Sequence, residues 1–414
     1  MTVKKIIIIG AGPAGMMAAI RASQVGAQVI LIDKNSRPGR KLLLTGKGRS
    51  NLTNALELDL FIKRIFHGGD FLRDAFSKFF NQDLIRFFEE RGVKLKTERQ
   101  LRVFPENDRS VSIIDALEKE IRGQKTEFIS NVSCKDIIVK DGSVKEVSLD
   151  NGTLVPADCV ILATGGASYA FTGSTGDGIS IARKLGHRII PLRPGLVPLV
   201  TKEKFVRTLE GLVLKNISIK FSCGKEKVIS EIGELLFTKS GISGPLVLSL
   251  SGKTADWLFE NKEVSAEIDL KPALSQAQLN ERLLREFKLN SKKALKNVLK
   301  ELLPLSFVKC FLLAAGLDPE IKVSHVTQEE RRKIIINLKS FRLGIAGTLP
   351  LEEAMVTKGG VSLKEINPRT MGSRLIKGLY FAGEIMDIDA DTGGFNLQAA
   401  FSSGYLAGES AALS

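Results

Sequence analysis

The sequence predicts an α/β fold that begins with a parallel sheet, because of the order of its first elements. Residues 3–9 form a β-branched run without polar alternation, which is typical of a strand buried on both faces. A glycine-rich turn at 10–15 follows directly, then an apolar helical stretch at 16–25 and a second apolar run at 28–32. This strand–turn–helix–strand order predicts a Rossmann-like nucleotide-binding domain.

Each glycine of the turn at 10–15 has a physical role. Gly10 permits the tight turn out of the strand, Gly12 lets a pyrophosphate approach the backbone, and Gly15 lets the helix pack closely on the sheet. The free N–H groups at the helix start would face the phosphates. Asp33, about 23 residues after Gly10, would accept hydrogen bonds from a ribose diol. We therefore predict that this region binds the adenosine half of a dinucleotide.

Composition favours a soluble cytoplasmic protein. A chain of 414 residues is expected to form two or three domains. No apolar run reaches the roughly 18 residues that span a bilayer, and no signal peptide is evident. The cysteines and histidines are scattered without metal-ligand spacing, so we predict no metal site and ordinary surface or core roles for them. They are Cys134, Cys159, Cys223 and Cys310, and His67, His187 and His325.

The net charge of +14 allows an anionic partner but does not identify one. A nucleic acid, a membrane surface or an anionic substrate would each fit. Several lysines fall on predicted helices, where a solvated face is the usual outcome. With one Trp and three Tyr, stacking platforms for bases are not evident, although the 22 Phe could serve. We therefore predict a small-molecule substrate, and the sequence disfavours a nucleic-acid partner.

Further elements of the first region follow from pattern. Helices are expected at 83–91 and 110–122, and strands at 127–138 and 145–149 with Asp141-Gly142 as the turn between them. Another buried strand begins at 158 and runs into a glycine turn that contains Ala163, Thr164 and Gly165.

The hydrophobic pattern of the sequence changes near residue 193. Period-two segments at 217–221 and 263–270 predict a mostly β domain. A helical block at 275–315 interrupts it, with Ser275 as a plausible N-cap. Strand-like sequence resumes near 322 and again at 334–343. The apolar stripe of the helical block consists of Leu279, Leu283, Leu284 and Phe287.

The end of the chain returns to the first sheet and points to FAD. A short strand at 379–382 ends at Gly383 and Glu384, and a glycine turn then begins a helix at 397–411. FAD needs a polar acceptor for its ribityl chain at the end of a later strand, which Glu384 or Asp387 could supply. A helix start at Asn396 would stabilise negative charge on the reduced flavin.

Several long motifs resemble the BaiN/YhiN-type bacterial flavoproteins, labelled NAD(P)/FAD-dependent oxidoreductases or aminoacetone-oxidase-family FAD-binding enzymes. The resemblance covers nearly the whole chain. It implies an FAD-binding domain of glutathione-reductase-like type, an inserted β-barrel-like domain, and a small helical domain inserted into that. The motifs are Gly39-Arg40-Lys41, Thr45-Gly46-Lys47-Gly48-Arg49-Ser50-Asn51-Leu52-Thr53-Asn54, Ala163-Thr164-Gly165-Gly166, Thr172-Gly173-Ser174-Thr175-Gly176-Asp177-Gly178 and Thr392-Gly393-Gly394-Phe395-Asn396-Leu397-Gln398.

The resemblance and the texture together predict domain boundaries. We place the FAD-binding domain at 1–192 and 345–414, the β-rich domain at 193–271 and 321–344, and the helical insertion at 272–320.

The resemblance also implies which residues meet the cofactor. Lys34, Arg40 and Lys41 would lie near the adenosine and phosphates, and Val132 would offer its backbone to adenine. Arg49, Asn51 and Thr53 would approach the flavin, and Glu384 with 396–398 would meet the ribityl and pyrimidine end. The predicted cofactor-binding set is Gly10, Ala11, Gly12, Pro13, Ala14, Gly15, Asp33, Lys34, Gly39, Arg40, Lys41, Gly46, Arg49, Asn51, Thr53, Val132, Ala163, Thr164, Gly165, Gly383, Glu384, Gly394, Asn396, Leu397 and Gln398.

Two residues depart from the family pattern. The family loop is commonly Ser-Gly-Gly-Gly-Arg-Cys-Asn, whereas Lys47 here replaces a glycine and Ser50 replaces the cysteine. Lys47 could stabilise the reduced flavin, contact substrate or point to solvent. Chemistry that depends on the family cysteine is therefore in doubt here. At the acid after the second strand the family usually has Glu, and Asp33 is one methylene shorter.

These features predict an FAD-dependent oxidoreductase that transfers a hydride at flavin N5. No second glycine fingerprint follows a strand, so NAD(P)H, if used, would bind transiently. No general acid is assigned, and Lys47, Arg49 and Tyr169 are candidates. Two alternatives stay open: an FAD-dependent RNA-modifying enzyme, which the charge motivates, and a non-catalytic flavin-binding protein. The sequence leaves the substrate and the oligomeric state open.

Overall fold

The structure is a computed structural model that describes residues 3–124 and 126–414. The chain divides into two compact units. Unit 1 contains the residues up to Pro194 together with Leu351–Ser414, and unit 2 is Gly195–Pro350.

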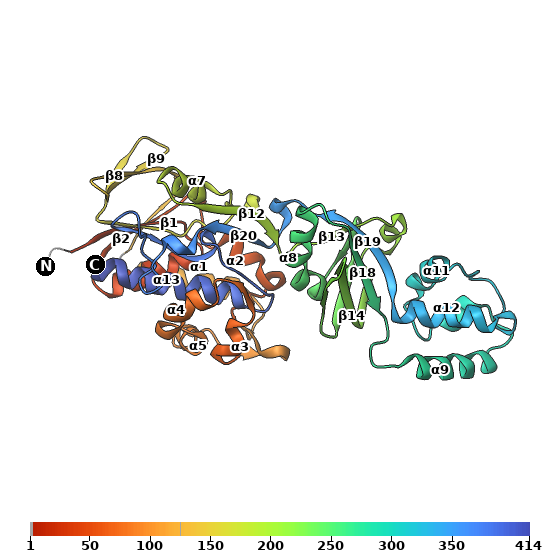
Figure 1. Cartoon of the computed structure of the whole chain (residues 1–414). Helices are drawn as coiled ribbons and strands as arrows, with labels where there is room; N and C mark the ends of the chain where they lie inside the picture. Colours follow the sequence, from red (N-terminus) through yellow and green to blue (C-terminus); the bar gives the residue numbers. More distant parts are fainter. Residues whose placement is uncertain (1–2, 125) are drawn as a thin grey trace. The chain divides into compact units, whose positions relative to one another are not determined.

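A five-stranded parallel sheet is the framework of unit 1 (Figure 1). Its order is β21-β11-β1-β2-β7, and each neighbouring pair is parallel. The N-terminal and C-terminal parts of the chain therefore meet in one sheet, because β21 lies beside β11 with Leu162 opposite Phe381. The strands are β1 Lys5–Ile9, β2 Gln28–Asp33, β7 Glu127–Ser130, β11 Cys159–Leu162 and β21 Leu379–Phe381.

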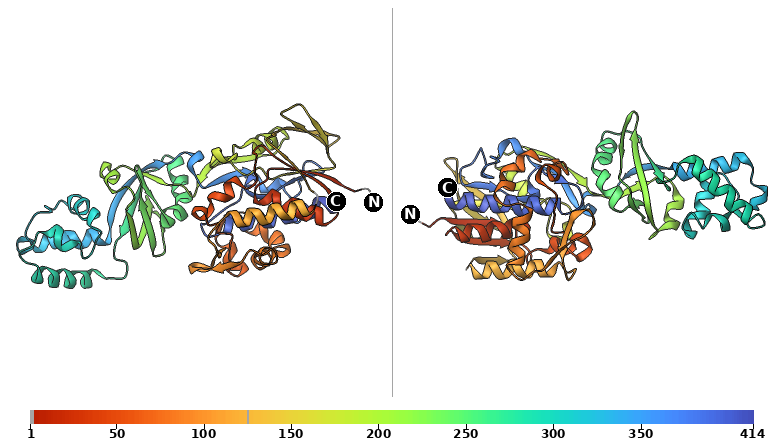
Figure 2. Two further views of the ribbon diagram at one scale, coloured as in Figure 1. Left: turned by 180° about the vertical axis from the view of Figure 1, so that it is seen from behind. Right: turned by 90° about the horizontal axis from the view of Figure 1, so that it is seen from below.

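Two helices from opposite ends of the chain pack on this sheet side by side, α1 (Pro13–Gln24) and α13 (Phe395–Leu413) (Figure 1 and Figure 2). Their backbones touch where α13 carries glycine. A Cβ on Gly404 would lie 2.2 Å from the Ala14 carbonyl oxygen, and one on Gly408 would lie 2.4 Å from that of Ala18. Only glycine at these positions allows so close an approach. The other helices of unit 1 are α2 Arg40–Leu44, α3 Leu58–Ile62, α4 Arg73–Lys78, α5 Asn81–Glu89, α6 Val111–Gly123 and α7 Asp177–Lys184.

The strand predicted at 127–138 is wrong as a single element. Residues 127–130 form β7, which joins the parallel sheet, and a new strand then begins at Cys134 in a separate antiparallel sheet. Between them Asn131 has φ +59°, so the chain changes direction there.

The minor strands of unit 1 are β3 Thr53–Asn54, β4 Ile65–His67, β5 Leu95–Thr97, β6 Arg102–Pro105, β8 Cys134–Lys140, β9 Ser143–Leu149, β10 Leu154–Pro156, β12 Ile189–Gly195, β20 Val356–Val361 and β22 Asp389–Ala390.

Unit 2 is built on an antiparallel sheet in the order β15-β14-β16-β17-β13-β19-β18. β14 also pairs with β18, with Phe221 opposite Ala266, so six of these strands close into a ring. Alternate residues of β18 are buried, as its period-two pattern predicts. The strands are β13 Leu199–Thr201, β14 Val213–Cys223, β15 Glu226–Ile229, β16 Gly233–Phe237, β17 Gly241–Ser243, β18 Val264–Asp269 and β19 Phe341–Thr348.

The helices of unit 2 share one apolar core with the ring. Ser275 caps α9, as predicted, by accepting a hydrogen bond from the Gln278 backbone N–H. Leu284 does not lie on the buried stripe, since it is 43% exposed. The helices are α8 Pro245–Phe259, α9 Gln276–Leu289, α10 Leu295–Leu299, α11 Leu305–Ala314 and α12 Gln328–Lys339.

The strand predicted at 334–343 is also wrong in its first half. Residues 334–339 belong to α12, and only the residues from Phe341 onward are strand. A capping box explains the helix, because Thr327 accepts from the Glu330 N–H while the Glu330 side chain accepts from the Thr327 N–H. The region near Lys322 makes one isolated bridge to Ala294 and no strand.

Candidate functional site

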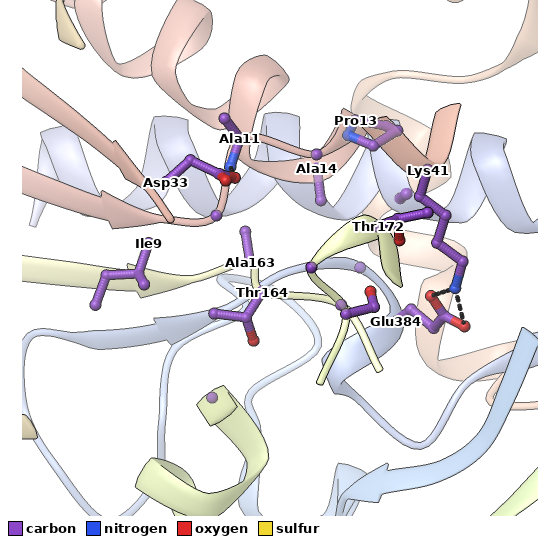
Figure 3. A pocket seen from close by; sticks show the side chains of 18 of the residues that line it. Ile9, Ala11, Pro13, Ala14, Asp33, Lys41, Ala163, Thr164, Thr172 and Glu384 are labelled. Carbon is purple, nitrogen blue, oxygen red and sulfur yellow. Dashed lines mark hydrogen bonds and ion pairs between the residues drawn. The ribbon is translucent and has the colours of Figure 1, made fainter. Parts of the chain in front are cut away.

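One pocket of unit 1 runs along the carboxyl ends of the parallel strands. The residues that directly follow β1, β11 and β21 line it, namely Gly10, Ala163 and Ala382. Asp33, the last residue of β2, lines it as well. Open α/β sheets bind ligands at this edge. Figure 3 shows Asp33 and Ala11 in one part of the pocket and Lys41 and Glu384 in another.

Two glycines of the turn at 10–15 are tightly packed, whereas a third borders unfilled space. A Cβ on Gly10 would lie 2.6 Å from the Ala163 carbonyl oxygen, and one on Gly15 would lie 1.8 Å from the Gly10 oxygen, so packing requires both glycines. A Cβ on Gly12 would meet no protein atom within 4 Å. Gly12 also precedes α1 without a side-chain cap. The helix start therefore offers backbone N–H groups and unfilled space to the pocket.

Asp33 anchors the turn. Its Oδ2 accepts a hydrogen bond from the Ala11 N–H at 2.7 Å, and its Oδ1 accepts from the Asn35 N–H at 2.7 Å and from Asn35 Nδ2 at 2.9 Å. A carboxylate has about four acceptor sites, so one is left for a ligand hydroxyl.

Lys41 and Glu384 form a half-buried ion pair on the pocket wall (Figure 3). Lys41 Nζ lies 2.7 Å from Glu384 Oε2, and it donates to Ser168 Oγ at 2.7 Å. The Thr357 backbone N–H donates to Glu384 Oε1 at 2.7 Å. The Ser168 hydroxyl also donates to Glu384 Oε1 at 3.2 Å, so groups from three other segments of unit 1 fix the carboxylate and orient it for further hydrogen bonds.

The other predicted basic residues on the wall also have protein partners. Lys34 Nζ lies 2.6 Å from Asp177 Oδ2, and Arg40 donates to Asn35 Oδ1 at 2.8 Å. Because the Asn35 amide is neutral, Arg40 keeps its charge, and it contributes to the electropositive side of the pocket together with the backbone N–H groups of the helix starts.

The second glycine turn begins α13 beside the loop at 51–54. A Cβ on Gly394 would lie 2.4 Å from the Thr53 carbonyl carbon, so this position also requires glycine. No side chain caps α13. The Asn396 side chain holds the preceding loop through the Ala390 N–H and carbonyl, both at 2.9 Å. Gln398 is buried and accepts a hydrogen bond from Thr53 Oγ1 at 2.6 Å.

The structure brings most of the predicted cofactor-binding residues to this one pocket. Those that line it are Gly10, Ala11, Gly12, Pro13, Ala14, Asp33, Lys34, Gly39, Arg40, Lys41, Val132, Ala163, Thr164, Gly165, Gly383, Glu384, Asn396 and Leu397. The remaining predicted residues, which do not line it, are Gly15, Gly46, Arg49, Asn51, Thr53, Gly394 and Gln398.

Arg49 lies in a cluster of acids away from the pocket lining. Its guanidinium pairs with Glu98 and Asp108, with Nε 2.8 Å from Asp108 Oδ1, and it lies 4.2 Å above the Phe104 ring centre. Lys47 is exposed at φ +59°.

Sequence reasoning missed four groups that organise the wall, namely Asn35, Ser168, Thr357 and Asp177. Asp177 belongs to a glycine-rich segment whose residues 172–178 line much of the pocket. The glycine-rich pattern was therefore a sequence signal for this part of the site. Ser168 and Thr357 carry no local signal, because their role depends on contacts with Lys41 and Glu384 far away in the chain.

A histidine–aspartate pair stands beside this region. β4 pairs with β22, which places His67 Nδ1 2.5 Å from Oδ1 of Asp389, a residue only 3% exposed.

Among the described residues no group of three or more His, Cys, Asp or Glu side chains could hold a metal ion. No helix in the described part of the chain is both long and apolar enough to cross a membrane.

Comparison with known proteins gives the family. A family model described as "HI0933-like protein Rossmann domain" matches residues 4–410. The chain belongs to this family. It is 32% identical over 412 residues to the 3-dehydro-bile acid delta(4,6)-reductase of Clostridium scindens, with 99% of both chains covered. It is 31% identical over 400 residues to the ribosomal RNA dihydrouridine synthase of Escherichia coli, with 96% of both covered.

Solved structures show the same fold. The 3-ketosteroid delta1-dehydrogenase of Sterolibacterium denitrificans aligns with a TM-score of 0.51 at 14% identity, over 100% of both chains. The fold is therefore an α/β Rossmann-type FAD-binding fold, and the protein is an FAD-dependent oxidoreductase of its family. The predicted family and enzyme class are confirmed.

The His67–Asp389 pair predicts a pH effect. The hydrogen bond to Asp389 raises the pKa of His67, against the opposing effect of burial, and Lys358 and Asp387 also face it. Because the folded-state pKa is above the unfolded value, the pair stabilises the protein fully below about pH 6.5. This stabilisation is lost as pH rises through the folded-state pKa. Asp389→Asn should bring the pKa of His67 down toward its ordinary value, measured by NMR titration of the imidazole.

Asp141→Asn is the matched control, because it removes the same charge from an exposed turn. Its His67 titration should equal that of the wild type. An unchanged His67 pKa in Asp389→Asn would contradict the role of the pair.

Proposed function

We propose that the pocket of unit 1 holds FAD, with the adenosine diphosphate half at α1 and the isoalloxazine end at α13. This proposal rests on the relative direction and the axial offset of the two helix starts. Ala14 meets Gly404 and Ala18 meets Gly408, so the helices run in the same direction. α13 begins nine residues before Gly404 and α1 one residue before Ala14, which offsets the two starts by about 12 Å along the axis. Two helix starts separated in this way in one pocket suit the two halves of an extended dinucleotide.

The adenosine half would be held by the first turn. The open space at Gly12 and the uncapped start of α1 suit a pyrophosphate, which the helix N–H groups would bind. The one acceptor site left on Asp33 suits a ribose hydroxyl. Val132, also on the wall, would offer its backbone to adenine.

The flavin half would be held by groups at the second turn. Glu384, fixed by Lys41 and Thr357, would accept hydrogen bonds from the ribityl hydroxyls. The N–H groups at the start of α13 near Asn396 and Leu397 would stabilise negative charge on the pyrimidine end.

The reaction we propose is the reduction of a carbon–carbon double bond conjugated to a carbonyl group. The names of the relatives support it: a 3-dehydro-bile acid delta(4,6)-reductase acts on an unsaturated ketone, and a dihydrouridine synthase reduces the double bond of a uracil ring. When bound, FAD supplies the hydride chemistry for such a step. NAD(P)H, bound transiently, is the electron donor that we propose. It is oxidised to NAD(P)⁺ while the double bond takes up its hydride and one proton.

Uridine in RNA is the second candidate substrate. The net charge of +14 favours it over an uncharged small molecule, and relatives in both Escherichia coli and Haemophilus influenzae are ribosomal RNA dihydrouridine synthases.

Gly12→Val tests the cofactor site. The Cβ of the added side chain would meet no protein atom within 4 Å, and the backbone of Gly12 (φ −80°, ψ −177°) is open to any residue. The variant should therefore melt within about 2 °C of wild-type apoprotein, while its FAD dissociation constant rises about 100-fold, since valine fills the pyrophosphate space. Gly123→Val, at an equally open position in α6, is the control and should bind FAD normally. Equal FAD affinity in both variants would contradict the site.

Anaerobic spectroscopy tests the reaction. FAD-loaded protein should lose its flavin absorbance with NADH or NADPH, added separately. It should regain that absorbance when a 3-oxo-4-ene steroid or a uridine-containing RNA is then supplied. A flavin that neither nicotinamide reduces would contradict NAD(P)H as donor. A reduced flavin that neither probe reoxidises would contradict the substrate class.

A further inference from the structure

Four lysines gather at one end of the helical part of unit 2, and we call them the basic tip: Lys288, Lys292, Lys293 and Lys322. Lys288 lies in the last turn of α9, and Lys292 and Lys293 follow in the loop to α10. This loop is joined to the segment before α12. The Val323 N–H donates to the Lys293 carbonyl at 3.0 Å, and Lys322 bridges Ala294.

The charge of the basic tip is not compensated within the described part of the chain. All four lysines are exposed, and no ion pair to any of them is found there. Two other lysines of the same helical segment are neutralised: Lys339 lies 2.7 Å from Asp269, and Lys296 pairs with Glu320. Lys300 and Lys309 are exposed without an ion pair in the described residues, but they lie outside this loop. Glu320, the acid nearest to Lys322 in sequence, is thus already engaged. The basic tip therefore concentrates uncompensated positive charge on a backbone that hydrogen bonds hold in place.

The surroundings of the basic tip suit a phosphate chain better than a lipid surface. Exposed hydroxyls and an imidazole stand among the lysines, at Ser291, Ser324 and His325. The Ser324 N–H donates to the Ser291 carbonyl at 3.1 Å, so these side chains share one fixed surface. Leu289, 80% exposed, lies next to Lys288, and Leu284, 43% exposed, lies one turn before it, whereas membrane-surface helices present a broad apolar face.

We propose that the basic tip binds the phosphate backbone of an RNA substrate. This inference rests on the second candidate under the proposed function, in which the reduced base is part of an RNA. Lysine contacts to phosphate give affinity and register without reading sequence, and they release condensed counterions. The basic tip would thus anchor the RNA, while the chemistry belongs to the pocket of unit 1.

The test uses full-length, FAD-loaded protein and a fluorescent RNA hairpin with a uridine-rich loop. The variant K288Q/K292Q/K293Q/K322Q removes the basic tip. The control K135Q/K140Q/K145Q/K184Q removes four exposed lysines of unit 1 that form no ion pair in the described residues. Binding is measured over a series of salt concentrations. The basic-tip variant should bind at least about tenfold more weakly, with the slope of log K against log salt reduced by about 2 to 3, while the control keeps the wild-type slope.

Two results would overturn the assignment. Equal loss of affinity in both variants would show that only net charge matters. Binding of wild-type protein to phosphatidylglycerol vesicles but not to RNA would assign the surface to a membrane. FAD content and anaerobic reduction by NAD(P)H are recorded for every variant and should stay at wild-type values. A failure of RNA binding is thereby separated from a failure of the FAD-dependent function.

Discussion

The backbone contact between α1 and α13 is the constraint on which the rest of unit 1 depends. Gly404 and Gly408 let the two helices approach until a single Cβ would clash with a carbonyl oxygen. The contact joins residues almost 400 positions apart and fixes the offset between two glycine turns. The parallel sheet adds to this, because β11 lies between β21 and β1 and holds the ends of the chain in register. Neither turn alone suits a long cofactor, whereas their fixed separation suits the FAD that we propose.

Most basic side chains on the pocket wall have an acidic partner. The lysines of the wall, Lys34 and Lys41, are neutralised by Asp177 and Glu384, whereas Arg40 donates only to the neutral Asn35 amide. Anionic phosphate would therefore be met by Arg40 and by backbone N–H groups, which are oriented by the fold and lose no side-chain freedom on binding. Exposed lysines without an ion pair in the described residues gather at the basic tip of unit 2, and those of unit 1, such as Lys135 and Lys184, do not line the pocket. This division suits a protein in which one site holds a cofactor and another surface recruits a polyanion.

The sequence was sufficient for the local elements around the first turn, because glycine spacing and β-branched runs are local signals. It also identified Glu384 and Asn396 as wall residues, since each follows a strand end or a glycine turn. Contacts between residues far apart in the chain could not be predicted from the sequence. Arg49 stays a predicted cofactor contact, and the sequence did not indicate that Glu98 and Asp108 pair with it. At 334–336 three isoleucines suggested a strand, whereas the capping box at Thr327 and the core of unit 2 select a helix.

The most direct measurement is a crystal structure of the protein with FAD bound. We expect the pyrophosphate at the start of α1 beside Gly12, the ribityl chain at Glu384, and the isoalloxazine ring at the start of α13. A ring system that lies away from α13, or a pyrophosphate that avoids the α1 N–H groups, would contradict this expectation.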